Sequence, residues 1–358
     1  MTALPETSSP ALYVDEDCNF KVIHDVPVPE LVDGEVVIKV LYSGVKPADI
    51  KHGLGLGIRS TTLGYDFCGR VAQAGPTSEY KAGELVAGYT PTGFGRPLRY
   101  GTHQPFLGCP EDMMFKVPEN VPPTHAASLT TVLTTAADGL YTIFGYSPPG
   151  EKPQDGFKPG GPLLIWGASA SVGLCMVQLA RASGASPIIV TASPSRHEPL
   201  KRLGATHCFN YRSPDVASCI GAAVEESKAG PILYAADCAG SYGEVTSAAQ
   251  MEACVGDDAI LLSVVEHRET RYKMPLASAN KDVTIRFGNG PVMTIPARTE
   301  AWKKMSTALA WAVSRYGTEF HLPSVEVFKG SAEEALEVVK KVADQGKFGK
   351  LVLEQPWA

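Results

Sequence analysis

Residues 162–185, PLLIWGASASVGLCMVQLARASGA, decide the predicted fold. The first five are apolar and predict a buried strand, after which a turn of small residues begins at Gly167. Residues 171–183 predict a helix that stops at Gly184. A strand, a tight turn and a helix in this order make a βα unit whose helix N-terminus offers free N–H groups to a phosphate.

The same alternation continues along the chain. The pattern predicts strands at residues 187–191, 232–236 and 259–264 and a short helix at residues 196–203. Strands that alternate with helices indicate a parallel sheet built from right-handed crossover units. The middle of the chain is therefore predicted to be a doubly wound Rossmann domain of the α/β class.

The parts of the chain before and after this domain show a different pattern of predicted secondary structure. The first third predicts short strands separated by turns, at residues 35–42, 63–72, 84–87 and 115–118. A long helix is expected at residues 124–144, and an exposed Pro/Gly/Lys-rich loop at residues 147–161. The C-terminal part predicts an amphipathic helix at residues 331–345 and a last strand at residues 350–354.

Composition narrows the function classes. The 358 residues are 44% hydrophobic and carry a net charge of -6, so nothing favours nucleic acid as a partner. No apolar run reaches the length of a membrane span, and the N-terminal residues lack the pattern of a signal peptide, which predicts a cytoplasmic protein. None of the eight cysteines lies two or three residues from another, so we expect buried thiols and no zinc knuckle.

The small-residue turn is a candidate dinucleotide site. Gly167 and Gly173 hold the outer positions of the glycine fingerprint, but Ser and Ala replace glycines between them. The residues expected beside the pyrophosphate are Ser169, Ala170, Ser171 and Val172. An ordinary strand–turn–helix with small residues is the alternative reading of this loop.

The residues that follow the predicted strand at 187–191 bear on whether the cofactor is NADH or NADPH. An enzyme that uses NADH carries Asp or Glu there, whereas this chain has Ser193, Ser195 and Arg196. Hydroxyls and a guanidinium suit a 2′-phosphate, which a carboxylate would repel. We therefore expect NADPH. The alternative is that Arg196 is a solvated residue at a helix start.

Further segments occur in a specific order along nearly the whole chain. They are residues 45–49 (VKPAD), 63–71 (LGYDFCGRV), 82–86 (AGELV), 126–129 (AASL) and 349–352 (GKLV). In this order they resemble the medium-chain dehydrogenase/reductase superfamily. The resemblance implies a GroES-like catalytic domain made from residues 1–136 and 298–358. Residues 137–297 would then form the Rossmann NADPH-binding domain, with the cofactor at the carboxyl ends of the strands.

Within this superfamily the chain resembles the zinc-free, quinone oxidoreductase-like branches. Zinc-dependent members carry an early Cys and a Gly-His-Glu motif. Here Lys46 lies near the Cys position, and the motif reads Gly64-Tyr65-Asp66. Without that thiolate and imidazole, we expect no catalytic zinc.

Among the zinc-free branches the chain is most similar to fungal trans-acting enoyl reductases that serve polyketide synthases. The Pro-rich insert, the Ser/Ala turn and the run at residues 47–51 (PADIK) carry this resemblance. It implies NADPH-dependent reduction of an α,β-unsaturated, carrier-bound polyketide thioester in secondary metabolism, with the acyl carrier domain of a polyketide synthase as partner. Two alternatives stay open: reduction of a free quinone or enone, and a non-redox binding or cyclisation protein on this scaffold.

The resemblance also implies roles for individual residues. Lys51 is the candidate to stabilise an enolate or relay a proton, with a surface lysine as the alternative, and Thr135 would contact the nicotinamide. Further cofactor contacts are expected from Ala48, Asp49, Lys51, Tyr211, Ser263, Val264, Lys347 and Phe348. We expect Asp66 and Asp237 to be structural, and His103, His125 and His267 form no metal pattern.

Overall fold

A computed structural model describes residues 9–152, 160–267, 271–288, 290–345 and 348–357. It divides the chain into two units. The first unit contains Met1–Thr131, Ser278–Ala297 and Ser324–Ala358, and the second contains Val132–Ala277 and Arg298–Pro323. Part of the expected Pro-rich loop, residues 153–159, and the candidate Lys347 lie outside the described residues.

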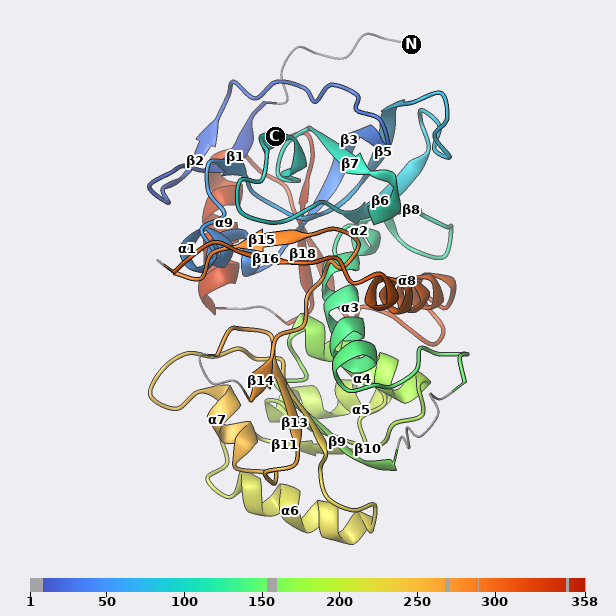
Figure 1. Ribbon diagram of the computed structural model, residues 1–358, viewed down its shortest axis with the longest axis vertical. Helices are drawn as coiled ribbons and strands as arrows, with labels where there is room; N and C mark the ends of the chain where they lie inside the picture. Colours follow the sequence, from blue (N-terminus) through green and yellow to red (C-terminus); the bar gives the residue numbers. More distant parts are fainter. Residues whose placement is uncertain (1–8, 153–159, 268–270, 289, 346–347, 358) are drawn as a thin grey trace. The chain divides into compact units, whose positions relative to one another are not determined.

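The first unit is built on strands from both ends of the chain (Figure 1). Its main sheet has the order β17-β18-β3-β5-β6-β8, with β7 also paired to β3. The strands of this sheet are β3 (Glu35–Val45), β5 (Asp66–Ala74), β6 (Leu85–Tyr89), β7 (Phe106–Pro110), β8 (Met114–Lys116), β17 (Val325–Phe328) and β18 (Lys350–Glu354). The C-terminal β18 pairs antiparallel with β3, so the chain ends form one domain, as the resemblance implied.

Smaller elements complete the first unit. They are β1 (Ala11–Val14), β2 (Phe20–Ile23), β4 (Thr61–Thr62), the hairpin β15 (Val283–Ile285) and β16 (Met293–Ile295), and the helices α1 (Ala48–Gly55), α2 (Pro123–Ala126) and α9 (Ala332–Gln345). A capping box starts α9, because Ser331 and Glu334 exchange side-chain to backbone hydrogen bonds. The predicted apolar face of α9 then packs into the core with α1 and β1.

The second unit is a six-stranded parallel sheet in the order β11-β10-β9-β12-β13-β14. Its strands are β9 (Gly160–Trp166), β10 (Ser186–Thr191), β11 (His207–Phe209), β12 (Tyr234–Asp237), β13 (Ile260–Ser263) and β14 (Tyr272–Lys273). This is the 3-2-1-4-5-6 order of dinucleotide-binding folds, so the order reverses between β9 and β12. The predicted doubly wound sheet is confirmed.

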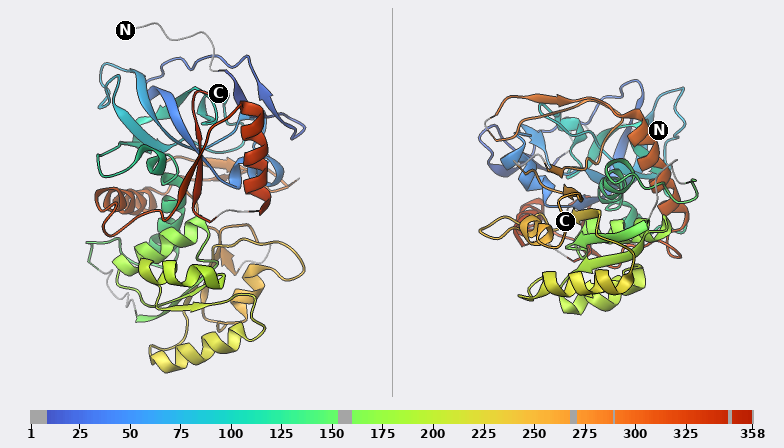
Figure 2. Two further views of the ribbon diagram at one scale, coloured as in Figure 1. Left: turned by 180° about the vertical axis from the view of Figure 1, so that it is seen from behind. Right: turned by 60° about the horizontal axis from the view of Figure 1, so that its bottom comes forward.

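Helices cover both faces of this sheet, as Figure 2 shows. They are α4 (Ser171–Ala182), α5 (His197–Leu203), α6 (Val216–Ser227) and α7 (Ser247–Glu252). The unit also contains α8 (Thr299–Ser314) and most of α3 (Thr130–Ala137). Val216 and Ile220 of α6 bury their side chains against Leu164 and Ile189 of the sheet. Because side chains alternate between the faces of a strand, the neighbouring residues of β9 and β10 are left for the opposite face.

The helix expected at residues 124–144 is not continuous. It is divided into α2, α3 and a π-helical turn, Asp138–Ile143. The turn begins at Asp138, whose buried carboxylate accepts hydrogen bonds from the Leu276 backbone N–H and from Arg298. These partners are far away in the sequence, so helical periodicity alone could not show the interruption.

The unit boundaries also differ from the predicted domains. The boundary lies at residues 131/132 rather than 136/137, and Ser278–Ala297 falls in the first unit. That segment is held by hydrogen bonds from the Phe94 N–H to the Thr284 carbonyl and from the Gly288 N–H to the Gly55 carbonyl. Arg298–Pro323 belongs to the second unit because it carries α8 and the partner of Asp138.

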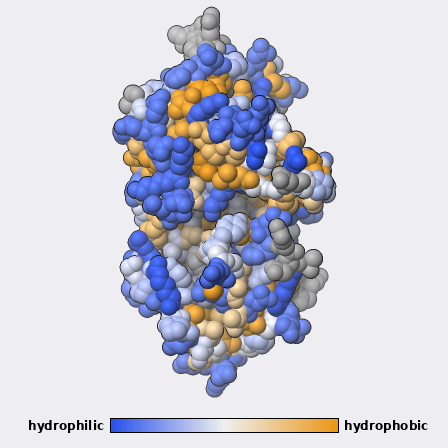
Figure 3. Space-filling view, turned by 90° about the vertical axis from the view of Figure 1, so that its left-hand side faces the viewer, coloured by the Kyte–Doolittle hydropathy of each residue, from blue (hydrophilic) through white to orange (hydrophobic). Residues whose placement is uncertain are grey.

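The molecular surface is mostly hydrophilic on the side seen in Figure 3, with hydrophobic side chains emerging between charged ones. Leu54 and Phe94 are examples of exposed hydrophobic residues in the first unit. Within the described residues, no helix combines the length and apolar character that crossing a bilayer requires.

Candidate active site

The predicted nucleotide loop follows β9 at the point where the strand order reverses. Gly167 has φ +73°, and a Cβ there would lie 2.6 Å from the Ala239 Cβ in the loop after β12. A Cβ on Gly173 would lie 2.7 Å from the Ala168 Cα, so α4 packs tightly against the turn. The N-cap residue Ala170 supplies no side-chain acceptor, which leaves the helix start without a side-chain cap.

The other predicted cofactor residues of the second unit follow neighbouring strands. Ser169 and Val172 follow β9, Ser193 follows β10, and Tyr211 follows β11. Ser263 ends β13, with Val264 directly after it, and Arg196 ends a short 3-10 turn after β10. Because these strands are parallel, their carboxyl ends lie along one edge of the sheet. The fold therefore brings residues from four loops to the edge where the cofactor was expected.

One basic residue at this edge was not among the predicted site residues. The Arg212 Nη1 donates a hydrogen bond to the Ser193 Oγ at 3.2 Å. Its guanidinium lies 4.6 Å from the centroid of the Tyr211 ring. The signal in the sequence was only its position, directly after Tyr211 and the third strand.

Asp237 has the structural role that we expected. Its Oδ1 accepts hydrogen bonds from the N–H groups of Ala239 and Gly240, at 3.0 and 3.2 Å. Its Oδ2 accepts a hydrogen bond from the Ser263 hydroxyl at 3.0 Å. The carboxylate thereby fixes the loop after β12, and it also orients the side chain of Ser263.

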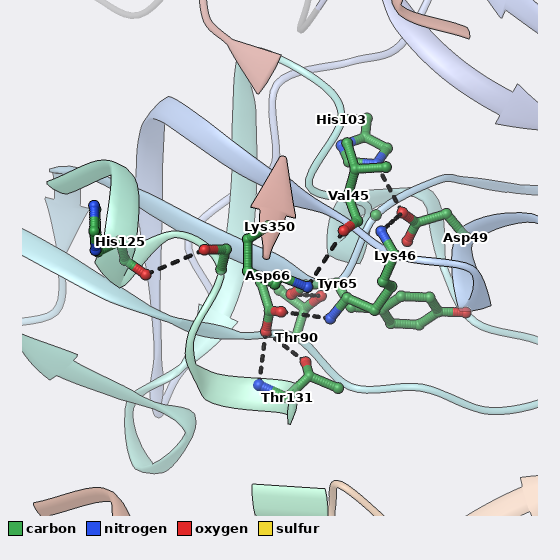
Figure 4. A network of polar contacts seen from close by, with 12 residues as sticks. Val45, Lys46, Asp49, Tyr65, Asp66, Thr90, His103, His125, Thr131 and Lys350 are labelled. Atoms are coloured by element: carbon green, nitrogen blue, oxygen red, sulfur yellow. Dashed lines mark hydrogen bonds and ion pairs between the residues drawn. The ribbon is translucent and has the colours of Figure 1, made fainter. Parts of the chain in front are cut away.

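The first unit holds a second group of candidate residues, on and around α1. Ala48, Asp49 and Lys51 lie on this helix. The Asp49 Oδ2 accepts hydrogen bonds from the Lys46 backbone N–H at 2.8 Å and from the His103 ring at 3.3 Å (Figure 4). Burial disfavours the charged carboxylate, but the hydrogen bond and charge of His103, with the charge of Lys46, outweigh burial and lower the pKa of Asp49.

Lys46 and Asp66 form a buried ion pair beside Asp49. The Lys46 Nζ lies 2.5 Å from the Asp66 Oδ2, and the two side chains are 6% and 0% exposed. The Asp66 Oδ1 accepts hydrogen bonds from the backbone N–H of Thr131, at 2.9 Å, and from its hydroxyl. Asp66 therefore joins β5 to the start of α3, as Figure 4 shows.

Tyr65 lies between the ion pair and α1. Its hydroxyl is 2.8 Å from the Nδ1 of His52, a residue that is not among the predicted site residues. Burial lowers the pKa of His52 to about 4, so the ring is neutral near pH 7. Burial likewise raises the pKa of Tyr65 to about 12. The guanidinium of Arg96 lies 4.5 Å from the centroid of the Tyr65 ring.

The remaining candidates lie at half-buried positions. Thr131 and Thr135 are half-buried on α3, whereas residues 132–134 between them are buried. A spacing of four residues places both threonines on the same face of the helix. Lys51 is half-buried on α1, and Phe348 is half-buried just before β18.

Comparisons with known proteins agree with this architecture. The family profile described as "Zinc-binding dehydrogenase" matches residues 171–305, and "Alcohol dehydrogenase GroES-like domain" matches residues 32–119. A zinc-type alcohol dehydrogenase-like protein of Schizosaccharomyces pombe is 31% identical over 248 residues, which cover 67% of each chain. The chain belongs to the medium-chain dehydrogenase/reductase superfamily.

Within this superfamily, the chain resembles fungal trans-enoyl reductases. One from Macrophomina phaseolina is 30% identical over 242 residues, or 66% of each chain. One from Aspergillus japonicus is 25% identical over 333 residues, or 89% of each chain.

Solved structures show the same fold. The quinone oxidoreductase from Coxiella burnetii gives a TM-score of 0.67 at 21% identity, covering 97% of this chain and 99% of that one. The CurK enoyl reductase gives 0.68 at 20% identity, with the same coverage.

The zinc named in one family description does not fit this member of the medium-chain superfamily. At the positions that resemble the ligand motifs of zinc enzymes, the chain places an ammonium, Lys46, against the carboxylate of Asp66. An ammonium is not a zinc ligand, and its charge opposes a divalent cation. Across the described residues, no three His, Cys, Asp or Glu side chains are grouped to hold a metal ion.

Proposed function

We propose that this chain is an NADPH-dependent enoyl reductase that reduces the C=C bond of an α,β-unsaturated, carrier-bound polyketide thioester. The names of its relatives, trans-enoyl reductases of several fungi, support the substrate class. A polyketide synthase that presents the substrate on its acyl carrier domain is the partner that this function requires.

The contact of Arg212 with Ser193 is the main observation that supports NADPH, rather than NADH, as the proposed cofactor. An NADPH complex is known for a mycobacterial neighbour of the same fold. In this chain the carboxyl ends of β10 and β11 present a guanidinium, a hydroxyl and the Tyr211 ring together. These groups suit the 2′-phosphate of the adenosine ribose, and Arg196 adds a second positive charge after β10.

The remaining contacts of the proposal follow the order of the strands. The pyrophosphate would bind the turn at Ser169, Ala170, Ser171 and Val172, at the start of α4. The nicotinamide would lie toward Ser263 and Val264, at the other side of the sheet edge, with Thr135 in contact. Contacts from Ala48, Asp49, Lys51, Lys347 and Phe348 belong to the same proposal.

Reduction of the C=C bond requires the protein to position the substrate and to stabilise developing charge, and it requires no protein nucleophile. The bound cofactor supplies a hydride for the β-carbon of the thioester. The chain must hold the alkene, stabilise the negative charge that develops on the carbonyl oxygen, and let a proton reach the α-carbon. Lys51 is proposed to relay that proton.

Oxidation of NADPH, followed by its absorbance, tests the proposal with three substrate classes: an unsaturated thioester on a carrier domain or pantetheine, a free enone and a quinone. We expect the thioester to be reduced fastest and NADPH to be preferred over NADH. Faster reduction of a free enone or quinone would make this a small-molecule reductase. NADPH binding without oxidation by any substrate would indicate a non-redox protein.

A further inference from the structure

The ion pair of Lys46 and Asp66 is fixed on every side. Asp66 is fully buried, and its two oxygens are held by Lys46 and by Thr131, so the carboxylate cannot turn away. The Lys46 backbone is held in turn, because its N–H donates to the Asp49 Oδ2 at 2.8 Å. Removing the two charges from water costs free energy, and this pairing leaves each buried charge with an opposite charge beside it.

The ammonium still has hydrogen-bonding capacity. It carries three N–H donors. Within the part of the chain that the structure describes, it donates to one oxygen, the Asp66 Oδ2, and it lies 5.6 Å from the centroid of the Tyr65 ring. Neither contact uses all the donors, and an aromatic face holds a cation without taking its protons. An oxygen atom of a bound molecule is the partner that would complete the shell.

The neighbouring polar groups are already engaged. The Tyr65 hydroxyl contacts His52, and His103 contacts Asp49 and Ser43. Lys350, the other lysine of this cluster, donates to the Val45 carbonyl at 3.4 Å. Lys46 is therefore a cation of this cluster with both a fixed position and donors to offer. It also lies near the sequence position at which the superfamily's zinc enzymes carry a cysteine ligand.

We propose that Lys46 is a catalytic residue whose ammonium, held in place by Asp66, binds the carbonyl oxygen of the substrate and stabilises the enolate. This inference rests on the proposed function. When a hydride from a reduced nicotinamide adds to the β-carbon, the π electrons of the alkene move toward the carbonyl oxygen. The α-carbon then takes a proton that comes ultimately from solvent, and the carbonyl forms again. Lys46 keeps its own proton throughout.

Two variants separate the charge of Lys46 from its contribution to folding. The double variant Lys46→Met/Asp66→Asn removes both charges together, so no unpaired carboxylate is left inside. The single variant Lys46→Gln keeps a donor for Asp66 without the positive charge. Lys21→Met is the matched control, because Lys21 pairs with Asp15 at the surface of the same unit. Circular dichroism and NADPH titration identify the variants that are folded.

We expect kcat for the unsaturated thioester to fall about 100-fold or more in both variants, since removal of one oxyanion donor has effects of this size. The dissociation constant for NADPH should not change, and Lys21→Met should match the wild type. A folded variant of either kind with kcat within about threefold of the wild type would overturn the role of Lys46 while leaving the proposed function intact. A wild type that reduces no thioester, enone or quinone overturns both.

A second measurement needs only the wild type. A saturated thioester labelled with ¹³C at the carbonyl is bound to the protein with NADP⁺, and its carbonyl stretch is followed by infrared difference spectroscopy. Hydrogen bonding to an ammonium should move the stretch to lower frequency. An unshifted band in the wild type would refute the contact, and a shift that persists in Lys46→Gln would assign it to another donor.

Discussion

His52 carries no charge near neutral pH because its ring is largely withdrawn from water. Burial lowers its pKa to about 4; the negative charge of Asp49 opposes this effect, and the positive charges of Lys46 and Arg96 add to it. The ring accordingly serves as a neutral partner of Tyr65. Its titration also couples the stability of the protein to pH.

We predict that His52 makes the protein less stable in mild acid. Its pKa is about 4 when folded and 6.5 in the reference state, so between these values the unfolded chain binds a proton that the native chain does not. The free energy of unfolding should fall as the pH drops from 6.5 toward 4, by at most about 3 kcal/mol. Urea unfolding across this range should show a shallower pH dependence for His52→Gln. Replacing the exposed His24 by Gln should leave the dependence unchanged, and equal slopes for His52→Gln and the wild type would contradict the assignment.

A second residue-scale prediction concerns Arg212. Its guanidinium is expected to bind the 2′-phosphate, and charge-assisted hydrogen bonds are worth about 1.5–3 kcal/mol. Arg212→Ala should therefore weaken NADPH binding about 10- to 100-fold and leave NADH binding unchanged. Fluorescence titration with both cofactors measures the ratio. Arg202→Ala, an exposed arginine of the same unit, is the control. Equal losses of affinity for NADH and NADPH would mean that Arg212 does not bind the 2′-phosphate.

At the scale of elements, two helical glycines have opposite surroundings. A Cβ on Gly173 of α4 would lie 2.7 Å from the Ala168 Cα, whereas a Cβ on Gly221 of α6 meets nothing within 4 Å. Gly173→Ala should destabilise the protein by about 1–3 kcal/mol and weaken NADPH binding, because the helix must move from the turn. Gly221→Ala should stabilise it by about 0.5–1 kcal/mol. Thermal unfolding with and without NADPH tests both, and a harmless Gly173→Ala would refute the close packing of α4.

At the scale of the whole molecule, the chain leaves the second unit after Ala277 and returns to it at Arg298. The return is secured by two contacts, from the Arg298 Nη1 and Nη2 to the two oxygens of the buried Asp138, at 3.0 and 3.1 Å. Helix α8 begins at the next residue.

Arg298→Met should lower the free energy of unfolding by up to about 3 kcal/mol, because it leaves the buried Asp138 carboxylate without its positive partner. The partial exposure of the Arg298 side chain to solvent reduces this effect. Denaturant unfolding of Arg298→Met and of Arg315→Met compares this pair with an exposed pair on the same segment, Arg315 with Glu319. Exposed ion pairs contribute about 0–1 kcal/mol, so Arg315→Met should leave the free energy of unfolding nearly unchanged. Equal effects would show that Asp138 does not depend on Arg298.

Local patterns in the sequence determined much of this protein. The apolar run before Gly167, the small-residue turn and the helix after it specified a βα unit, since each of these signals comes from residues close together in the chain. Repetition of the unit specified a parallel sheet, since alternating strands and helices form parallel crossover units. The predicted last strand, residues 350–354, has the same bounds as β18.

The pairing of side chains was decided by the tertiary structure. Arg212 meets Ser193 across 19 residues, Lys46 meets Asp66 across 20, and Arg298 meets Asp138 across 160. Such partners are set by strand register and by where distant segments return, and neither quantity leaves a period in the sequence. The sequence could therefore name Lys46 and Asp66 as departures from a zinc site. Only the folded chain shows that burial forces the two charges together, because an ion removed from water needs a partner close by.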